Sequence, residues 1–193
     1  MKFLRYSLLA TVFALSLSAC STASDPQPEL TPSAHYEMNR VLYYPANATS
    51  AGVSYAPAEV KAAGQLATEL RLSFGADRGE DDITFTLPAT QLTPNVVGSY
   101  SLQSRTAPGA GSTHVAYTFT VNRSAGGTSG RLYLSTANRV EGQLVLTNYD
   151  GRRRLLSGTY TLRLPDIADP YSTVASEKCN LTLQGSFENL PLQ

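Results

Sequence analysis

The chain has 193 residues with 15 basic and 15 acidic side chains, so its formal net charge is zero. Charged residues make up only 16% of the sequence, and tryptophan is absent. This composition argues against a nucleic-acid-binding protein, which needs clustered basic residues to meet the phosphates. The length suffices for one domain with a substantial core.

Residues 1–19 predict a signal peptide. Lys2 and Arg5 precede an apolar run over residues 6–17, which is too short for a helix that crosses a bilayer of about 30 Å. The run ends in Leu-Ser-Ala-Cys, with the cysteine at Cys20. This ending resembles a bacterial lipobox, and the resemblance implies cleavage before Cys20, acylation of the cysteine and attachment to a membrane by lipid. An ordinary signal peptide with a coincidental cysteine is the alternative.

Residues 20–34 predict a tether between the lipidated cysteine and the folded domain. The segment is rich in Pro, Ser and Thr and cannot bury enough apolar surface to fold, so we expect it to be disordered and partly extended. The residue after the cysteine is Ser21 and not an aspartate. In this respect the chain resembles lipoproteins that are sorted to the outer membrane. Loss of the signal peptide leaves 13 basic and 15 acidic residues, a net charge of −2.

Residues 35–193 predict a single all-β domain. Its first part carries weak signals: residues 36–44 predict a strand that ends at Pro45, and residues 47–54 predict a loop. Pro57 supplies a helix start, so residues 57–63 predict about one helical turn.

From Gln65 onward, hydrophobic and polar side chains alternate with a period of two, which is typical of half-buried strands. The residues expected to face inward are Leu66, Leu70, Leu72, Phe74, Ile83, Phe85, Leu87, Val96, Tyr100, Leu102, Val115, Tyr117, Phe119 and Val121. Five tyrosines fall outside the inward set and predict either half-buried sheet positions or an exposed aromatic surface for a partner or sugar: Tyr43, Tyr44, Tyr55, Tyr133 and Tyr149.

Residues 75–82 predict a polar turn that contains Asp77, Glu80, Asp81 and Asp82. We expect a solvated hairpin tip. A partial set of calcium ligands is the alternative, because calcium takes oxygen ligands from several carboxylates.

The strongest hairpin signal is Asp150-Gly151 between the alternating segments 142–149 and 156–164. Arg152, Arg153 and Arg154 follow at the hairpin tip. They are candidate interaction residues for anionic headgroups or an acidic partner. A charged turn that prevents edge-to-edge pairing is the alternative.

Residues 179–190 predict the final strand, with Cys179 on its inward face. If Cys20 carries lipid, Cys179 has no disulfide partner, so we expect a buried and unreactive thiol. A glycine–hydroxyl–aromatic motif occurs at residues 98–100, 158–160 and 185–187. It predicts that each glycine leaves room for a large ring from a neighbouring strand.

About eight to ten strands at short intervals predict an antiparallel β-sandwich, with a closed calycin-like β-barrel as the alternative. Alternation alone does not decide between them.

Segments 142–150, 156–162 and 183–190 carry the patterns G-x-[LI]-x-[LI]-T-x-[YF]-D, S-G-[TS]-[YF] and G-x-F-x-N. In these patterns the chain resembles a group of uncharacterised Bacteroidota lipoproteins, over roughly residues 65–193. The resemblance implies an outer-membrane, all-β envelope domain of unknown function, with no catalytic residues to carry over.

The sequence therefore favours a non-catalytic, lipid-anchored envelope domain that binds a protein, a glycan or a small ligand. One alternative is a carrier of an apolar ligand inside a barrel lined by Tyr100, Tyr117, Phe119 and Tyr160. Another is a hydrolase with a site assembled from distant loops, which would need His35 or His114 as its base. The sequence contains no recognised catalytic or metal-binding motif, and no cofactor is expected.

Overall fold

The computed structural model describes residues 32–77, 80–107, 109, 111–122, 127–172 and 176–193, and the chain from Pro32 to Gln193 forms one compact unit. The predicted signal peptide, Cys20 and most of the predicted tether lie outside the described residues. Within the described ranges, no helix is long and apolar enough to cross a membrane.

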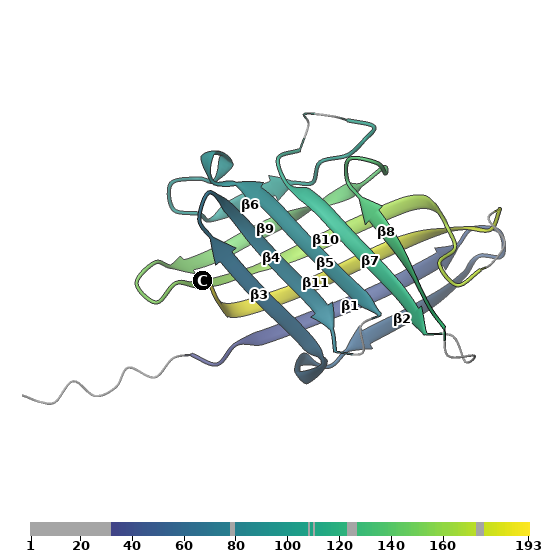
Figure 1. Cartoon of the computed structure of the whole chain (residues 1–193), viewed down its shortest axis with the longest axis horizontal. Helices are drawn as coiled ribbons and strands as arrows, with labels where there is room; N and C mark the ends of the chain where they lie inside the picture. Colours follow the sequence, from purple (N-terminus) through teal and green to yellow (C-terminus); the bar gives the residue numbers. More distant parts are fainter. Residues whose placement is uncertain (1–31, 78–79, 108, 110, 123–126, 173–175) are drawn as a thin grey trace, which may run out of the picture. The chain divides into compact units, whose positions relative to one another are not determined.

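The described part of the chain contains eleven strands and two short 3₁₀ helices (Figure 1). Their bounds are β1 His35–Tyr44, β2 Thr49–Tyr55, η1 Pro57–Glu59, β3 Val60–Leu66, β4 Glu69–Ala76, β5 Asp81–Pro88, η2 Ala89–Gln91, β6 Gly98–Ser101, β7 His114–Asn122, β8 Thr128–Leu134, β9 Glu141–Asp150, β10 Leu155–Ala168 and β11 Lys178–Pro191.

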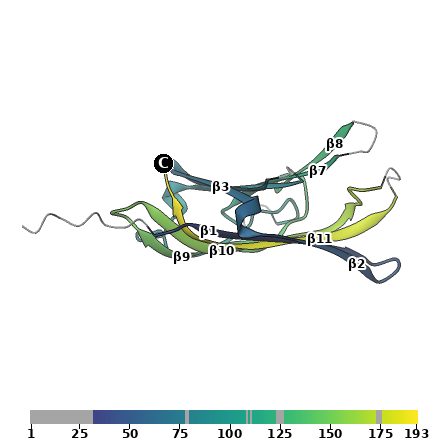
Figure 2. The same ribbon diagram turned by 90° about the horizontal axis from the view of Figure 1, so that it is seen from below.

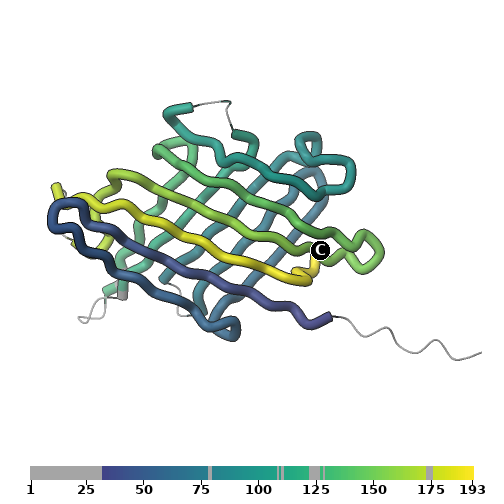
Figure 3. Tube along the Cα trace, turned by 180° about the vertical axis from the view of Figure 1, so that it is seen from behind, coloured from purple at the N-terminus to yellow at the C-terminus, as the bar shows by residue number. Residues whose placement is uncertain are grey.

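These strands form two antiparallel sheets. One sheet has six strands in the order β2-β1-β11-β10-β9-β6, and the other has five in the order β3-β4-β5-β7-β8. Figure 2 shows the two sheets edge-on as separate layers, and Figure 3 shows the six-stranded sheet from behind. The protein is therefore an antiparallel β-sandwich, as the sequence predicts.

The alternative of a closed calycin-like barrel is wrong. Each sheet ends in two edge strands, β2 and β6 in one and β3 and β8 in the other. The four rings expected to line an open interior are instead packed in the core, since Tyr100, Tyr117, Phe119 and Tyr160 are at most 5% exposed. Side chains thus fill the space that an apolar ligand carrier would need.

The predicted alternation is confirmed in the central strands. In β5, Ile83, Phe85 and Leu87 are buried while the threonines between them are half-buried on the outer face. Burial of alternate apolar side chains from both sheets supplies the main favourable term in folding. Cys179 is likewise buried on the inward face of β11, as predicted.

The glycine–aromatic motif has the predicted role in two of its three copies. β10 and β11 pair so that Gly158 lies opposite Phe187 and Tyr160 lies opposite Gly185. A Cβ added at Gly158 would stand 2.8 Å from Cζ of Phe187, and one at Gly185 would stand 2.5 Å from Cζ of Tyr160. Each glycine therefore leaves room for the ring of the neighbouring strand. At Gly98 the nearest atoms belong to its own segment.

For residues 47–63, the predicted loop is wrong over most of its length, and the predicted helical turn is confirmed at its start but is shorter than expected. Residues 49–55 form strand β2 where a loop was expected, and helical structure is limited to Pro57–Glu59 before β3 begins at Val60. β2 is an edge strand with no buried residue, so its sequence lacks the alternation that marks a half-buried strand. These two additional strands raise the count above the predicted eight to ten.

In β8, Tyr133 lies in the core, although the alternation did not place it among the inward residues. Tyr133 is 8% exposed and stacks on Tyr117 with ring centroids 5.8 Å apart. Leu132 and Leu134 are 60% and 38% exposed. β8 is an edge strand that pairs with β7. The Tyr133 ring takes the inward position opposite Tyr117, and the two leucines beside it point outward.

Candidate functional site

A hollow of about 660 Å³ lies at the end of β1 opposite to His35. The β1–β2 turn and the segment that joins β10 to β11 border it, and Figure 1 shows both at the same end of the sandwich. Its lining residues are Tyr44, Pro45, Ala46, Asn47, Thr49, Asp166, Asp169, Ser176, Glu177 and Lys178.

The β1–β2 turn forms one side of the hollow. Asn47 fixes the turn, because its Oδ1 accepts hydrogen bonds from the backbone nitrogen and the hydroxyl of Thr49, at 3.3 and 2.6 Å. Ala48 has φ of 54°, in the left-handed region that residues other than glycine rarely adopt. Such strained positions occur often at ligand-binding sites.

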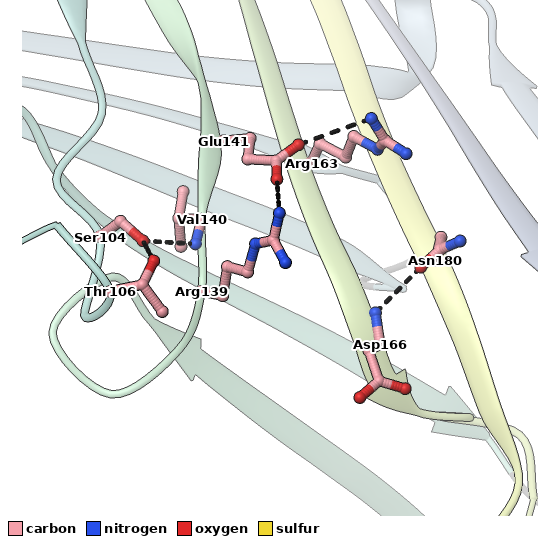
Figure 4. A network of polar contacts seen from close by, with 8 residues as sticks. All are labelled: Ser104, Thr106, Arg139, Val140, Glu141, Arg163, Asp166 and Asn180. Atoms are coloured by element: carbon pink, nitrogen blue, oxygen red, sulfur yellow. Dashed lines mark hydrogen bonds and ion pairs between the residues drawn. The ribbon is translucent and has the colours of Figure 1, made fainter.

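A β-bulge in β10 forms the second side. The pairing of β10 with β11 shifts register between Leu164 and Ile167, and Asp166 in the bulge has φ of 55°. Oδ1 of Asn180 accepts a 2.9 Å hydrogen bond from the backbone nitrogen of Asp166, while the Asp166 carboxylate points away from Asn180 (Figure 4). Bulges commonly re-aim a side chain, and this one presents an exposed carboxylate to the hollow.

Asp169 lies deeper, with 8% of its surface exposed. Its Oδ1 accepts hydrogen bonds from the backbone nitrogen of Tyr171 at 2.9 Å and from the hydroxyl of Tyr44 at 3.5 Å. Burial, followed by the nearby Asp169 charge, raises the pKa of Tyr44 to about 12. The Tyr44 phenol therefore keeps its proton at neutral pH and remains a hydrogen-bond donor.

The charges around the hollow are unequal. Among the described lining residues, three carry carboxylates, Asp166, Asp169 and Glu177, and one is basic, Lys178. Such a lining attracts a ligand with positive charge and offers several acceptors to ligand hydroxyl or ammonium groups.

A buried ion pair joins the two sheets near this end of the sandwich. Arg40 on β1 is 2% exposed and Asp81 on β5 is 0% exposed, and Nη1 of Arg40 lies 2.9 Å from Oδ2 of Asp81. The expectation of a solvated tip is wrong for Asp81, although Asp77 and Asp82 are exposed as predicted. Asp81 begins β5 in phase with Ile83, which turns it into the sandwich.

Two phenols complete the surroundings of Asp81. The hydroxyls of Tyr55 and Tyr117 both donate hydrogen bonds to its carboxylate. Burial and the bonded Asp81 carboxylate raise the pKa of both tyrosines well above the usual range. Arg40 and the two phenols together satisfy the buried carboxylate, as a charge withdrawn from water requires.

The ion pair also positions the wall of the hollow. Nη2 of Arg40 donates a 3.0 Å hydrogen bond to the hydroxyl of Tyr171. The Tyr171 ring meets Phe119 edge-on, with centroids 5.1 Å apart, and the Arg40 guanidinium lies 4.4 Å from the centre of the Phe119 ring. Since Tyr171 is bonded to Asp169 through its backbone, Arg40 holds the Asp169 segment in place.

The arginines singled out in the sequence lie far from this hollow, on the β9–β10 turn. Asp150 Oδ1 accepts hydrogen bonds from the backbone nitrogens of Arg152 and Arg153, at 3.0 and 3.1 Å. Arg154 Nη2 donates to the carbonyl of Gln193 at 2.6 Å. Arg154 thus holds the end of the chain near β3, and the interaction role of the three arginines stays a prediction.

The C-terminal residues contact the edge of the second sheet directly. Leu192 forms a parallel bridge with Gly64 of β3, and the backbone nitrogen of Gln193 donates a 2.9 Å hydrogen bond to the Gly64 carbonyl. The chain thereby covers part of an edge strand, one of the ways in which proteins avoid edge-to-edge pairing.

The two histidines lie at strand starts. His114 is exposed on the outer face of β7, as predicted, and His35 lies 3.4 Å from Glu37 on β1. A hydrolase would need a carboxylate beside His114, and the described residues that line the hollow next to it include none. Among the described residues, no group of three His, Cys, Asp or Glu side chains is arranged to hold a metal.

The sequence analysis missed most of the hollow. It noted Tyr44 as an aromatic outside the core but singled out neither Asp166 nor Asp169. The available signal was two aspartates close together near the end of a long strand, Asp166 within β10 and Asp169 just after it, and aspartates are common in turns and loops.

Fold and site define this chain as an antiparallel β-sandwich with an acidic hollow at one end. In comparisons with known proteins, the chain matches no protein-family model, no curated protein and no solved structure.

Proposed function

We propose that the protein is a lipid-anchored, non-catalytic binding domain of a Bacteroidota-type outer membrane, and that its acidic hollow takes a small ligand with positive charge and hydroxyl groups. The predicted lipobox at Cys20 supports the anchor. The ligand belongs to the envelope or its surroundings, for example an amino sugar of an envelope glycan.

The single observation that carries the ligand class is the excess of carboxylates in the hollow. The described lining carries three carboxylates, from Asp166, Asp169 and Glu177, against one lysine, Lys178. The Tyr44 ring adds an apolar surface of the kind that packs against sugar rings.

The position of the hollow fits an anchored binding domain. The chain enters the sandwich at His35, and β1 runs ten residues to Tyr44. At about 3.3 Å per residue, the strand carries the β1–β2 turn roughly 30 Å from the entry point. The hollow therefore lies at the end of β1 opposite to the one at which the chain enters the domain.

Binding can be tested by titrating the mature protein with glucosamine, with glucose and gluconate as neutral and anionic counterparts. We expect glucosamine to shift backbone NMR resonances of residues around the hollow, and glucose and gluconate to shift them less. Asp166→Asn should weaken binding by about two- to fivefold, the effect of losing one partly exposed charge. Asparagine tolerates the left-handed backbone at this position, so the fold should be unaffected.

Glu37→Gln is the matched control, because Glu37 lies near the opposite end of β1. It should leave the affinity unchanged. Equal weakening by Glu37→Gln and Asp166→Asn, or stronger binding of gluconate than of glucosamine, would contradict the proposal.

A further inference from the structure

A second hollow, of about 710 Å³, lies where the chain passes from β6 to β7. It shares no lining residue with the acidic hollow. Its described lining contains no Asp, Glu, Lys or Arg. The polar side chains that line it are those of Gln91, Ser99, Ser101, Gln103, Ser112 and His114.

Backbone hydrogen bonds give this hollow a fixed base. Leu102 and Thr113 form an isolated parallel bridge, and the backbone nitrogen of Gln103 donates a 2.8 Å hydrogen bond to the Thr113 carbonyl. The backbone nitrogen of Ser112 donates to the Ser101 carbonyl at 3.1 Å. A Cβ at Gly111 would stand 2.6 Å from the backbone nitrogen of Gln103, so the close approach of these segments requires glycine.

One side chain of the hollow is left without a partner. Oε1 of Gln103 is buried and makes no hydrogen bond with the described part of the chain. The hydroxyl of Tyr100, in contrast, donates to the Val96 carbonyl at 2.8 Å and accepts from the backbone nitrogen of Thr93 at 3.1 Å. Buried polar atoms in folded proteins are almost always paired, so the Gln103 side-chain oxygen calls for a partner that the described residues do not supply.

The Gln103 amide can reach such a partner in the hollow. The last torsion of a glutamine side chain is broad and roughly two-fold, so rotation about it brings either the oxygen or the nitrogen to the hollow. The amide thus offers one acceptor and two donors to a ligand.

We infer that this second hollow binds a neutral saccharide. Amide and serine hydroxyl groups both donate and accept, which matches the hydroxyls of a sugar. A charged ligand would lose hydration here without meeting an opposite charge. The inference is independent of the proposed function, because it rests on different residues and on a ligand without charge.

Gln103→Leu separates a ligand-binding role from a structural one. Removing an unpaired buried acceptor should leave the midpoint of thermal unfolding unchanged or raise it, while the loss of the amide weakens saccharide binding by about tenfold or more. The probes are maltose, cellobiose and lactose, added to the mature protein in a detergent without a sugar headgroup. Binding is read from the side-chain NMR signals of His114 in both proteins, and also from those of Gln103 in the unmodified protein.

Gln184→Leu on the outer face of β11 is the matched control, because it makes the same chemical change outside the hollow. It should bind the sugars like the unmodified protein. The inference is overturned if no disaccharide shifts the His114 and Gln103 signals at millimolar concentration. It is also overturned if Gln103→Leu lowers the unfolding midpoint and leaves binding unchanged, or if glucuronate binds as tightly as the neutral sugars.

Discussion

The Arg40–Asp81 pair is the most unusual arrangement of individual residues in the sandwich. Taking two charges out of water costs several kcal/mol for each ion, and their attraction offsets this only when the remaining hydrogen-bonding groups are satisfied. Here the two phenols satisfy the Asp81 carboxylate and the Tyr171 hydroxyl accepts from Nη2 of Arg40. Nε and Nη1 of Arg40 are buried and make no hydrogen bond with the described residues, so Nη1 contributes through the ion pair alone. The arrangement connects β1, β5 and the wall of the acidic hollow, so its main consequence is to fix how these elements lie together.

Replacing Arg40 with methionine should destabilise the domain by about 3–5 kcal/mol, because it leaves the Asp81 carboxylate buried without its cation. Urea unfolding followed by circular dichroism measures the change. Lys61→Met is the control, since Lys61 pairs with Asp77 on the surface and an exposed pair contributes at most about 1 kcal/mol. Similar losses for both variants would show that the buried pair has no special role.

The stability of the domain should fall as the pH rises above about 9. Burial, and then the Asp169 charge, raises the pKa of Cys179 from 9.0 to about 11, and burial raises that of Tyr44 from 10.0 to about 12. The folded state therefore holds protons that the unfolded chain releases. This contribution to stability is complete below pH 9 and is lost progressively as the pH approaches 11 and 12.

Urea unfolding at pH 9 and pH 11 checks this expectation. Cys179→Ala should reduce the dependence on pH, because it removes the thiol that titrates first. A free energy of unfolding that stays constant or rises through this window would contradict the assignment of both groups.

At the scale of the strands, the sequence predicts those elements whose two faces differ. β5 alternates between buried and half-buried residues, and so its position and its inward side are predictable. β2 has no fully buried residue, and only Val53 and Tyr55 near its end are half-buried, so most of this edge strand carries no such pattern. The alternation in β5 also places Asp81 on the inward face, two residues before Ile83. From the sequence alone this could not be predicted, because a carboxylate is expected to face water unless a buried partner is known.

The reciprocal glycine–aromatic pairs of β10 and β11 lead to a prediction about single methyl groups. In Gly185→Ala, the new Cβ would meet the Glu37 backbone carbonyl and the Tyr160 ring. Because a backbone carbonyl in the sheet has little freedom to move, we expect a loss of about 1–3 kcal/mol. The midpoint of urea unfolding measures it.

Gly130→Ala in β8 is the matched control. The nearest atom to its new Cβ would be the Phe119 carbonyl oxygen at 3.8 Å, an ordinary contact, so the change should stay within about 0.5 kcal/mol. An equal effect at both positions would mean that the ring opposite Gly185 does not require a glycine.

The acidic hollow could not be predicted in the same way, because it exists only when distant segments meet. The Tyr44–Thr49 turn and the Asp166–Lys178 segment are separated by most of the sequence. The pairing of β1 with β11 brings them together, and the β10 bulge turns Asp166 into the space between them. Alternation identifies the faces of strands, whereas a site at the ends of strands depends on their order in the sheet.

For the whole molecule, the lipid anchor is the prediction with the largest consequence for function. Cys20→Ala should abolish labelling of the protein with a radioactive or clickable fatty acid. It should also move the domain from the membrane fraction to the soluble fraction, or leave it with an uncleaved signal peptide. Cys179→Ala is the control and should retain the label. Membrane attachment and acylation that persist in Cys20→Ala would refute the lipobox.

The partnership of the first strand with the last has a consequence for biogenesis. β1 has β2 as its neighbour on one side, but on the other it pairs with β11 from His35 opposite Glu188 to Tyr43 opposite Asn180. Closing that pair brings together opposite ends of the domain, a type of non-local connection that slows folding. During translation the six-stranded sheet therefore stays incomplete until its final residues have been made. If the predicted signal peptide directs export, this late closure would keep the nascent chain unfolded while it passes through a secretion channel.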